Sequence, residues 1–521
     1  MKILSYHFGH DGSITYLRKG RIIFHSQLER TNKFKSHAIP SRELVDTLKR
    51  HDIKPDVFVL TWADYNDWVP NLISLFKRNN IISEKTKILK IGRKEHHIFH
   101  ALCAFHTTKF REGNIYVYDA HGAVSDHEGL EVEECVSGYA IKDEVYQLLK
   151  KYYINDNNVA ECGVAYGRLN SSLGLHHTQC GHTMAFSSYG EEDSSIPSFL
   201  NKDYVFKKEY FTGHDGFKPI NNLKQKLTLD KEDTYSKNIA WRVQKDFEEK
   251  TLFDIKKFIS QHPCENLVIT GGCAQNIFSN TRLLKELGVN VQIDPMCNDQ
   301  GISIGSAIKC WLEHMNTKVN RMEQVFLGFN PEYNLDILKD YKIEDCDDDR
   351  IIDLLINKEV VALFSGRSEQ GQRGLGHRSL LVDATLKDAR ERISAIKKRA
   401  WYRPFACSIL EEDFASYFEA DGIKKSPYML YVFKMKDPVE SVVSQGNYSR
   451  VQTVDQENTN YYNILKAFKN KTNIPFLLNT SLNLPGEPLV ETLGDLKTTL
   501  ENSVLKYAYL PDIKKLIIKQ N

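Results

Sequence analysis

The chain has 521 residues, a formal net charge of +1 and 41% hydrophobic residues. At roughly 100–200 residues per domain, this length excludes a single small binding module. The composition excludes a disordered or collagen-like chain. The balanced charge excludes a protein drawn to nucleic acid or membrane by its overall field, although a local basic surface stays open.

Targeting signals are also missing from the sequence pattern. No stretch approaches the roughly 20 apolar residues that span a bilayer, and the first residues turn polar too early for a signal peptide. The 10 cysteines form no C-x-x-C pair, so neither a disulfide framework nor a zinc ribbon is expected. We therefore expect a cytoplasmic protein with reduced cysteines and no membrane partner.

Apolar residues predict alternating strands and helices in the first part of the chain. The first three strands form a meander, because short alternating segments are separated by turns. Longer runs with helical spacing separate the later strands. In chain order, we predict strands at 3–8, 13–17 and 21–27, a helix at 41–50, a strand at 56–61, a helix at 95–107, a strand at 114–119, helices at 159–173 and 234–261, a strand at 267–270, a helix at 274–287, a strand at 290–293 and a helix from 302.

Two halves of this kind, each opening with a meander, predict the duplicated α/β fold of actin, sugar kinases and Hsp70-type ATPases. The repeat is structural, since no sequence repeat is visible. Periodicity then fades, and an acidic run at 344–349 marks a domain boundary. We predict a first domain at 1–325, a linker zone at 326–350 and a second α/β domain at 351–521, which opens with a helix at 351–356 and a strand at 360–365.

Histidines and aspartates at the ends of predicted elements form the first candidate site. His96 and His100 are four residues apart on a helix, so both imidazoles can reach one ion. Asp119 ends an apolar strand, and Asp299 lies at a helix start. Such a set suits a divalent metal that is open to phosphate or carbonyl oxygens, although histidine pairs on helices also serve as polar packing. Polar packing is the expected role of the spare histidines His97, His106 and His121.

A Gly271-Gly272 turn after a strand is the second candidate site, with Asn276 in the following helix. Turns and helix N-termini of the duplicated fold surround nucleotide phosphates, because unpaired N–H groups favour anions. A Gly-Gly turn between strand and helix is common in itself. The nucleotide interpretation therefore depends on the position of the turn in the second half of the fold.

Arginines gather among glycines in the predicted C-terminal domain. Residues 366–379 include Arg373 and Arg378, whose forked guanidinium groups suit phosphate or carboxylate. Residues 397–405 add cations beside aromatic residues, a pattern that also fits a solvated face or a nucleic-acid patch. The polar residues 479–483 follow an apolar strand, where ligands are usually held.

Several long motifs occur in one order from about residue 3 to about residue 500. They are His-Asp-Gly-Ser at 10–13, His-His-x-x-His-Ala at 96–101, Asp119, Gly-Gly-x-x-x-Asn at 271–276, Asp-x-Gly at 299–301, Gly-Arg-x-Glu-x-Gly-x-Arg-x-Leu-Gly-x-Arg-Ser at 366–379, Lys-x-Arg-x-Trp-x-Arg-Pro-Phe-Ala at 397–406, Arg-Val-Gln-Thr-Val at 450–454, Leu-Asn-Thr-Ser at 478–481 and Gly-Glu-Pro at 486–488. In this order the chain resembles the nodulation and antibiotic O-carbamoyltransferase family.

The resemblance implies a fold and a reaction. It implies an N-terminal domain similar to tRNA threonylcarbamoyl-transfer enzymes and a C-terminal YrdC-like domain. Carbamoyl phosphate and ATP would give carbamoyl-adenylate, whose carbamoyl group passes to an acceptor hydroxyl as AMP leaves. Two activities in one chain suit this chemistry, because the mixed anhydride hydrolyses unless it is kept from water.

The resemblance also assigns residues by position. It implies that a divalent metal, Fe²⁺ or Mg²⁺, anchors the nucleotide phosphates on His96, His100, Asp119 and Asp299. It implies nucleotide contacts from Gly12, Ser13, Gly271, Gly272 and Asn276. It implies that carbamoyl phosphate and ATP bind Arg373, Arg378, Lys398, Arg399, Arg403, Arg450, Asn479 and Ser481. His10, next to Asp11, is our candidate for the base that takes the acceptor's proton; a hydrogen-bonded turn histidine is the alternative.

The chain departs from the family pattern in three places. Residues 180–190 read Cys-Gly-His-Thr-Met-Ala-Phe-Ser-Ser-Tyr-Gly where the family usually reads Gly-Lys-x-Met-Gly-Leu-Ala-Pro-Tyr-Gly, so His182 or a neighbour replaces a lysine. Residues 444–449 lack the family's His and Asp-Gly, and Ala120 replaces a glycine. These changes affect the expected nucleotide contacts and indicate an unusual acceptor.

Two other functions and two acceptor classes stay open. The alternatives are a tRNA threonylcarbamoyl-type transferase and a nucleotide-binding regulatory protein, although the latter predicts damaged metal ligands. We expect a small-molecule or sugar hydroxyl as acceptor. The hydroxymethyl group of a modified pyrimidine in DNA, such as 5-hydroxymethylcytosine, is the alternative, because the basic stretch 18–35 contains aromatic residues.

Overall fold

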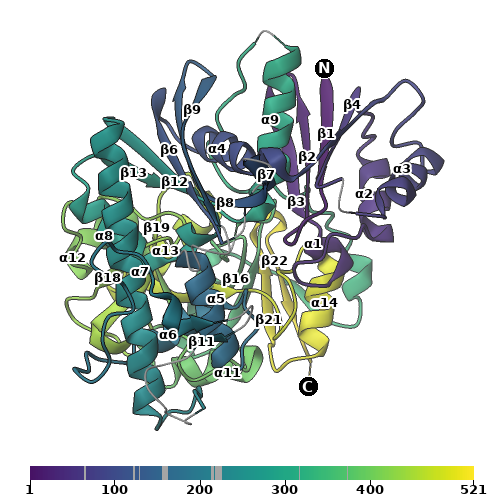
Figure 1. Cartoon of the computed structure of the whole chain (residues 1–521). Helices are drawn as coiled ribbons and strands as arrows, with labels where there is room; N and C mark the ends of the chain where they lie inside the picture. The colour runs from purple at the N-terminus through teal and green to yellow at the C-terminus, as the bar shows by residue number, and fades with distance from the viewer. Residues whose placement is uncertain are drawn as a thin grey trace. The chain divides into compact units, whose positions relative to one another are not determined.

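The computed structural model describes residues 1–63, 66–120, 122, 124–127, 130–154, 162–212, 216–217, 226–315, 317–371 and 373–520 (Figure 1). Its contacts divide the chain into two compact units. We call Met1–Lys90, Met322–Ala400 and Pro404–Asn521 the composite unit, and Ile91–Arg321 with Trp401–Arg403 the central unit. Within the described ranges, no helix combines the length and the apolar character that crossing a membrane requires.

The composite unit opens with a five-stranded sheet in the order β3-β2-β1-β4-β5. Its strands are β1 (Lys2–His7), β2 (Ser13–Arg18), β3 (Arg21–Gln27), β4 (Val57–Thr61) and β5 (Lys87–Ile91). The first three strands are antiparallel neighbours, whereas β1 and β4 are parallel. Because a parallel pair needs a crossover connection, helices lie between β3 and β4.

Three helices accompany this sheet: α1 (Glu29–Asn32), α2 (Arg42–Arg50) and α3 (Val69–Arg78). Apolar residues of α2 and α3 share one core with β1 and β4, and Figure 1 shows both helices beside these strands. The Leu44 amide donates to the Ser41 hydroxyl at 3.0 Å, so Ser41 is the N-cap of α2.

The central unit contains a second sheet in which β13-β12-β6-β8 are consecutive neighbours and β7 and β9 both pair with β8. Its strands are β6 (Glu112–Tyr118), β7 (Val124–His127), β8 (Leu130–Lys142), β9 (Val145–Ile154), β12 (Asn266–Thr270) and β13 (Asn290–Ile293). A separate pair joins β10 (Phe211–Thr212) to β11 (Gly216–Phe217). Its helices are α4 (His96–His106), α5 (Cys162–Ser172), α6 (Cys180–Ser187), α7 (Thr234–Gln261), α8 (Ile277–Glu286) and α9 (Ile302–His314).

The two sheets have the same strand order. The order β9-β8-β6-β12-β13 repeats β3-β2-β1-β4-β5, with an antiparallel meander whose first strand also pairs in parallel with the next strand of the sheet, β4 in one case and β12 in the other. This duplication confirms the predicted actin- and Hsp70-type α/β fold. The repeat is invisible in the sequence because strand order depends on pairing between distant residues.

The C-terminal part of the composite unit is a nine-stranded mixed sheet in the order β14-β22-β21-β15-β16-β20-β17-β19-β18. Its strands are β14 (Lys342–Asp345), β15 (Val361–Phe364), β16 (Arg378–Val382), β17 (Ala406–Leu410), β18 (Val432–Lys434), β19 (Tyr448–Val454), β20 (Phe476–Ser481), β21 (Tyr507–Leu510) and β22 (Lys515–Ile518). Its helices are α10 (Asp348–Ile356), α11 (Ala389–Lys397), α12 (Phe414–Tyr417), α13 (Thr459–Thr472) and α14 (Leu493–Glu501).

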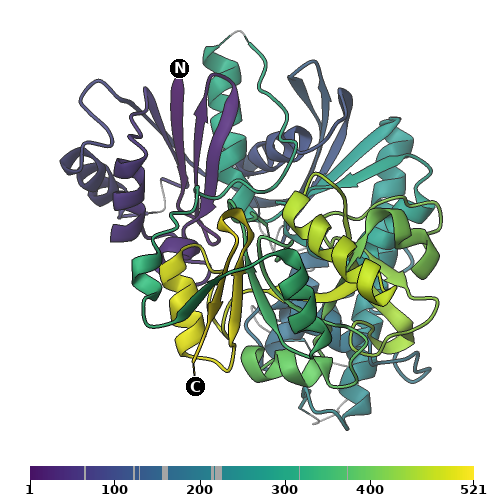
Figure 2. The ribbon, with the colours of Figure 1, turned by 180° about the vertical axis from the view of Figure 1, so that it is seen from behind.

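A single core joins α10 and α13 to the middle of this sheet, through residues such as Leu355, Phe468 and Leu477. Figure 2 shows the other side of the molecule, where the yellow strands β21 and β22 and helix α14 lie near the C-terminus. The predicted second α/β domain is therefore confirmed as an α/β fold.

Some element boundaries differ from the prediction. The helix expected at 274–287 begins as a 3-10 turn, Gly272–Gln275, and α8 starts only at Ile277 because Asn276 is extended and caps it. The predicted start of the helix at 159–173 lies outside the described residues. The compact units follow a different division from the domains expected at 1–325 and 351–521, whose boundaries stay a prediction.

Candidate functional site

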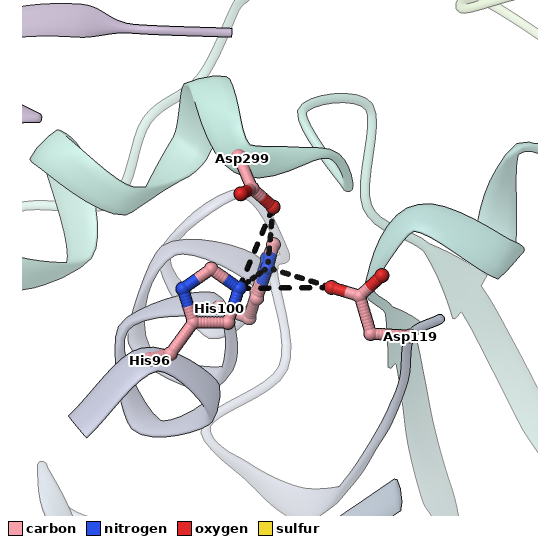
Figure 3. Close-up of side chains that lie close together, drawn as sticks. All are labelled: His96, His100, Asp119 and Asp299. Atoms are coloured by element: carbon pink, nitrogen blue, oxygen red, sulfur yellow. Dashed lines mark hydrogen bonds and ion pairs between the residues drawn. The ribbon is translucent and has the colours of Figure 1, made fainter. Parts of the chain in front are cut away.

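The predicted metal ligands come from three places in the central unit. His96 and His100 lie one turn apart on α4, and both are buried. Asp119 directly follows β6, and Asp299 opens a 3-10 turn, Asp299–Gly301, before α9. Figure 3 shows the two imidazoles and the two carboxylates pointing toward one another.

Distances between these side chains fit a single metal ion. The two Nε2 atoms of His96 and His100 are 3.2 Å apart. Their distances to the carboxylate oxygens of Asp119 and Asp299 are 3.6 and 3.5 Å from His96 and 3.5 and 3.4 Å from His100. Four ligand atoms at bond lengths of about 2.0–2.1 Å in a tetrahedral site lie about 3.3 Å apart. The set, whose atoms lie within 4.8 Å of one another, can therefore surround one ion with small movements.

Charges inside the cluster compensate one another. Burial alone lowers the pKa of an imidazole, but the carboxylates of Asp119 and Asp299 outweigh it, so the pKa of His100 rises to about 9 and that of His96 rises as well. Burial likewise opposes ionisation of Asp119, but hydrogen bonds from both imidazoles hold its pKa well below the ordinary value. Without an ion, the cluster therefore binds protons where a metal would bind.

A second layer of contacts fixes the loop that carries Asp119. The Asp119 amide donates to the Cys135 carbonyl at 2.8 Å, and the Gly122 amide donates to the Glu134 carbonyl at 2.8 Å. A Cβ atom on Gly122 would lie 2.0 Å from His97 Nε2. His97 is buried and its Nδ1 lies 2.7 Å from the hydroxyl of Ser137, so it supports this loop.

Among the described residues, the metal-ligand group does not include the spare histidines His97 and His106. His106 contacts the Glu144 carboxylate at 2.8 Å and the Leu102 carbonyl at 2.8 Å. His121 lies outside the described residues.

The two glycines predicted to approach a nucleotide lie against the strand that carries Asp119. Gly271 has a φ of 94°, and a Cβ there would lie 2.2 Å from the Tyr118 carbonyl oxygen. A Cβ on Gly272 would lie 2.9 Å from the Asp119 carboxylate. Close packing against Tyr118, next to the candidate ligand Asp119, thus demands glycine at Gly271, and the nucleotide role of the pair stays a prediction.

Asn276, the third residue of this predicted loop, makes internal hydrogen bonds. Its side-chain oxygen accepts from the Ser279 amide at 3.1 Å, which caps α8. The side-chain amide groups of Asn276 and Gln244 also donate to each other, with two hydrogen bonds of 3.0 Å. Asn276 therefore positions the turn that leads into α8.

His10 and Asp11, the predicted catalytic pair, lie in the turn between β1 and β2. The His10 side chain is 56% exposed, and its Nδ1 lies 3.3 Å from the Asp11 carboxylate. Asp11 has a left-handed φ of 54°. Ser13, predicted to contact nucleotide, is buried at the start of β2, opposite His7. The side chains of His10 and Asp11 are both accessible to solvent and lie close enough to exchange a proton.

Arg378 faces the interior of the composite unit. It is fully buried on β16, and its guanidinium donates to the carbonyl groups of Ser365 at 2.7 Å, Gly366 at 3.1 Å and Glu491 at 3.3 Å. The guanidinium also lies 3.7 Å from the centre of the Phe364 ring. These contacts fix the arginine-rich loop to the sheet.

The other predicted anion-binding residues have different environments. Arg373 is half-buried, and Lys398 is exposed with a φ of 42°. Arg399 donates to the Pro404 carbonyl at 2.9 Å. Arg450 lies on β19, and Arg403 belongs to the central unit.

Lys397, which the prediction missed, is the buried lysine of its motif. Its ammonium donates to the carbonyl oxygens of Ser481 at 2.8 Å and Asn483 at 2.7 Å. Ser481 donates to the Asn483 side chain at 2.7 Å. Helical spacing indicates that Lys397 faces inward, because Ile393, Ile396 and Lys397 share the inner face of α11.

Asn479 belongs to a buried polar network on the same strand as Ser481. Its side-chain amide donates to the Ser408 hydroxyl at 2.9 Å and to the Gln452 side chain at 3.1 Å. Asn479 and Ser481 thus lie on β20, and Lys397 of α11 contacts the end of this strand and the loop after it.

His182, in the segment that departs from the family pattern, contacts a residue far away in the sequence. Its Nδ1 lies 2.8 Å from the hydroxyl of Tyr402. The neighbouring Trp401 donates from its indole to the Leu229 carbonyl at 3.2 Å and contacts the rings of Phe186 and Tyr189. The replacement therefore joins an aromatic cluster in the central unit.

Comparison with known families decides the identity of the chain. A model described as "Carbamoyltransferase N-terminus" matches residues 61–308, and one described as "Carbamoyltransferase C-terminus" matches residues 352–516. The chain belongs to the carbamoyltransferase family. The family expected from the motifs is thereby confirmed, and this carbamoyltransferase is a transferase enzyme.

Two relatives match the carbamoyltransferase over nearly its whole length. It is 25% identical to Nodulation protein NolNO of Sinorhizobium fredii, over 94% of this chain and 77% of the relative. It is 24% identical to 3'-hydroxymethylcephem-O-carbamoyltransferase of Amycolatopsis lactamdurans, over 95% of each chain. Among solved structures, T. kodakarensis HypF has a TM-score of 0.36 and 12% identity, over 60% of this chain and 48% of that chain. The fold assignment rests on the strand topology.

Proposed function

We propose that this carbamoyltransferase uses ATP and carbamoyl phosphate to carbamoylate an acceptor hydroxyl. The observation that carries the proposal is the intact cluster of His96, His100, Asp119 and Asp299 in a member of this family. A regulatory protein that had lost turnover has no need to keep four buried ionisable groups together, because such groups are costly to bury without a ligand or partner.

The donor set favours one class of metal. Two imidazoles with two carboxylates suit Fe²⁺ and related transition metals, whereas Mg²⁺ prefers oxygen ligands alone. We therefore favour Fe²⁺ on these four side chains. A bound cation of this kind would anchor phosphate oxygens and stabilise negative charge on a leaving phosphate.

The first half-reaction forms carbamoyl-adenylate. Water cleaves carbamoyl phosphate to carbamate and phosphate, and a carbamate oxygen then attacks the α-phosphorus of ATP, which releases pyrophosphate. We place this step in the C-terminal part of the composite unit. Arg373, Arg399 and Arg450 supply guanidinium groups for the anions, and Arg378 and Lys397 hold the surrounding loops through the carbonyl groups described above.

The second half-reaction transfers the carbamoyl group. The acceptor hydroxyl attacks the carbamoyl carbon, its proton passes to a base, and AMP leaves with the pair of electrons of the broken anhydride bond. His10 is the proposed base, because its imidazole is exposed and its Nδ1 lies 3.3 Å from the Asp11 carboxylate, which can orient the ring. Gly12 and Ser13 follow directly and are proposed nucleotide contacts. In the central unit, Gly271, Gly272 and Asn276 are proposed nucleotide contacts as well.

Two classes of acceptor hydroxyl fit the proposed transfer. A small-molecule or sugar hydroxyl fits the family, since one relative is named for a hydroxymethylcephem. A hydroxymethylated pyrimidine presents the same primary alcohol.

Pyrophosphate release tests the proposal. Purified protein is incubated with ATP and with Fe²⁺ or Mg²⁺, with and without carbamoyl phosphate, and then with a panel of alcohols. We expect pyrophosphate release that requires carbamoyl phosphate, and a mass gain of one carbamoyl group on the true acceptor. The proposal is refuted if pyrophosphate release is the same with and without carbamoyl phosphate in the presence of either metal.

A further inference from the structure

Three buried amide side chains of the composite unit contact the arginine-rich loop. They are Gln452 on β19, Asn479 on β20 and Asn458 directly before α13, and we call them the amide cluster. Their exposed fractions are 2%, 0% and 8%, respectively. In the sequence, Gln452 lies two residues after Arg450 and Asn479 lies two residues before Ser481, so both belong to motifs of the predicted anion site.

The amide cluster holds the carbonyl groups of one turn in this loop. The Leu375 carbonyl accepts from Gln452 Nε2 at 2.8 Å and from Asn458 Nδ2 at 2.9 Å. The Gly374 carbonyl accepts from Asn479 Nδ2 at 3.2 Å. Donors from two strands and one helix start therefore fix two consecutive carbonyl groups, and we call these two residues the 374–375 turn.

Hydrogen bonds within the amide cluster keep its side chains in place. Asn479 Nδ2 also donates to the Ser408 hydroxyl at 2.9 Å and to Gln452 Oε1 at 3.1 Å. The Ser408 hydroxyl donates to Gln452 Oε1 at 2.8 Å. Turning one of these side chains toward a ligand would leave buried polar groups without partners, which is costly. The amide cluster is therefore built to act on the 374–375 turn.

Main-chain amide groups of the turn are occupied as well. The Leu375 amide donates to the buried Glu369 carboxylate, and so does the Arg378 amide at 3.2 Å. Loops that bind phosphate through their main chain leave such N–H groups to the anion. Here the side chain of Arg373, directly before the turn, is the proposed anion contact, so its place depends on the conformation of the turn.

The 374–375 turn also packs closely against the end of β20. A Cβ on Gly374 would lie 2.8 Å from the Cα of Ser481 and 3.0 Å from the Arg378 carbonyl oxygen. Residues two apart on a strand share a face of the sheet, so Asn479 holds the turn from the same face that carries Ser481. A shift of the turn would therefore move Arg373 relative to Ser481.

We propose that the amide cluster positions Arg373 for the formation of carbamoyl-adenylate by holding the 374–375 turn against β20. This inference rests on the proposed function, because Arg373 is the anion contact of that step. Gln452, Asn458 and Asn479 are then positioning residues and contact neither carbamoyl phosphate nor ATP. This role differs from the ligand contact that the sequence motif implies for Asn479.

The test compares Gln452→Met and Asn458→Ala with the wild type. Each variant removes one donor to the Leu375 carbonyl, and the donors come from different elements, so a shared effect reports on the turn. Because a binding group displaced by about 1 Å functions poorly, we expect each variant to raise the KM for carbamoyl phosphate at least about fivefold in the pyrophosphate assay. The change in kcat should be smaller.

Ser426→Ala is the matched control. Ser426 is buried, and its hydroxyl donates to the Val451 carbonyl on β19 at 2.8 Å, so the variant also loses a buried hydrogen bond to main chain. We expect it to lose stability in urea and to keep the KM of the wild type. A KM raised as much as in Gln452→Met would show that any buried defect has this effect and would overturn the inference.

A double-mutant cycle with Arg373→Met tests whether the amide cluster acts through Arg373. In the Arg373→Met background, Gln452→Met should change the KM less than about twofold, because the group to be positioned is gone. Binding of labelled carbamoyl phosphate is measured by equilibrium dialysis as well, so a slow variant still gives a value. Asn458→Ala takes the place of Gln452→Met in the cycle if the latter does not fold.

An unchanged KM in the folded variants would overturn the inference, as would equal effects of Gln452→Met with and without Arg373. Either result leaves the proposed function intact if the wild type needs carbamoyl phosphate to release pyrophosphate. A wild type that releases pyrophosphate equally well without carbamoyl phosphate would refute the proposed function, and the inference with it.

Discussion

The candidate metal cluster of the central unit and the arginine-rich loop of the composite unit contrast in how they use charged residues. In the cluster, four ionisable side chains point at a common centre, and their charges compensate one another (Figure 3). In the loop, the most buried charge, Arg378, points into the protein and donates to main-chain carbonyl groups. Both regions carry motif residues, yet the motif forms a candidate ligand site in one and fixes a loop conformation in the other.

Donor chemistry explains the difference. A carboxylate or imidazole has few positions for partners, so a group of them that point at one another is suited to hold an ion. A guanidinium has five N–H donors, and carbonyl groups of its own loop can occupy them. Motif arginines therefore divide into those that hold the fold and those that are available to a ligand, and burial separates the two.

The largest effect is expected from removing a metal ligand. His96→Ala or Asp299→Ala should lower metal affinity at least about 100-fold and abolish carbamoyl transfer, because three ligands cannot compensate the lost charge or donor. Metal content by mass spectrometry and the mass gain of the acceptor check this. His106→Gln, in the same helix, should keep its metal; full transfer by either ligand variant would contradict the assignment.

A buried arginine should affect stability more than activity. Arg378→Met leaves buried carbonyl groups without a donor, so we expect a loss of about 3 kcal/mol in the free energy of unfolding. Arg373→Met should instead keep most of the stability and slow carbamoyl-phosphate-dependent pyrophosphate release. Urea denaturation and the pyrophosphate assay separate the two, and equal stability of both variants would contradict the different roles of Arg378 and Arg373.

Proton competition should make metal binding depend on pH. The raised pKa of His100, about 9, means that a metal must displace a proton below that pH. Affinity should therefore rise roughly tenfold per pH unit for each proton displaced, between about 6.5 and 9. Titration with Fe²⁺ under anaerobic conditions measures this, and a pH-independent affinity across that range would exclude the raised pKa.

The stability of the metal-free protein should fall as the pH rises, whereas its affinity for metal rises. A raised histidine pKa stabilises the folded state at pH values below the unfolded value of about 6.5. This contribution is lost as the pH rises toward about 9. The free energy of unfolding of the apoprotein, measured by urea denaturation, should thus fall over this pH range. The free energy of unfolding of the metal-loaded protein should not show this fall.

The smallest effect concerns the loop that carries Asp119. Gly122→Ala places a Cβ 2.0 Å from His97 Nε2 and 2.6 Å from the Glu134 carbonyl oxygen. The loop must shift, so we expect a loss of about 1–3 kcal/mol in stability together with weaker metal binding. Gly181→Ala is the control, since no atom lies within 4 Å of its added Cβ; equal metal affinity in both variants would show that the loop adapts freely.

Local regularities of the sequence predicted much of the candidate site. Helical spacing put His96 and His100 on one face, because a turn of helix repeats every 3.6 residues. Apolar runs located the strand before Asp119 and the helix after Asp299. These are short-range properties, so the four candidate ligands could be named without knowledge of the tertiary structure, and the structure brings them together.

Long-range pairing and burial were decided only by the tertiary structure. The repeated strand order of the two sheets depends on hydrogen bonds between residues far apart in the chain. Whether Arg378, Lys397 or Lys398 faces inward depends on which carbonyl groups the fold leaves nearby. By itself, the sequence determined the family and the chemical types of the site residues, because these are written in residue order. Only the folded chain decided which charged side chains donate hydrogen bonds to buried carbonyl groups, because those groups come from segments far apart in the sequence.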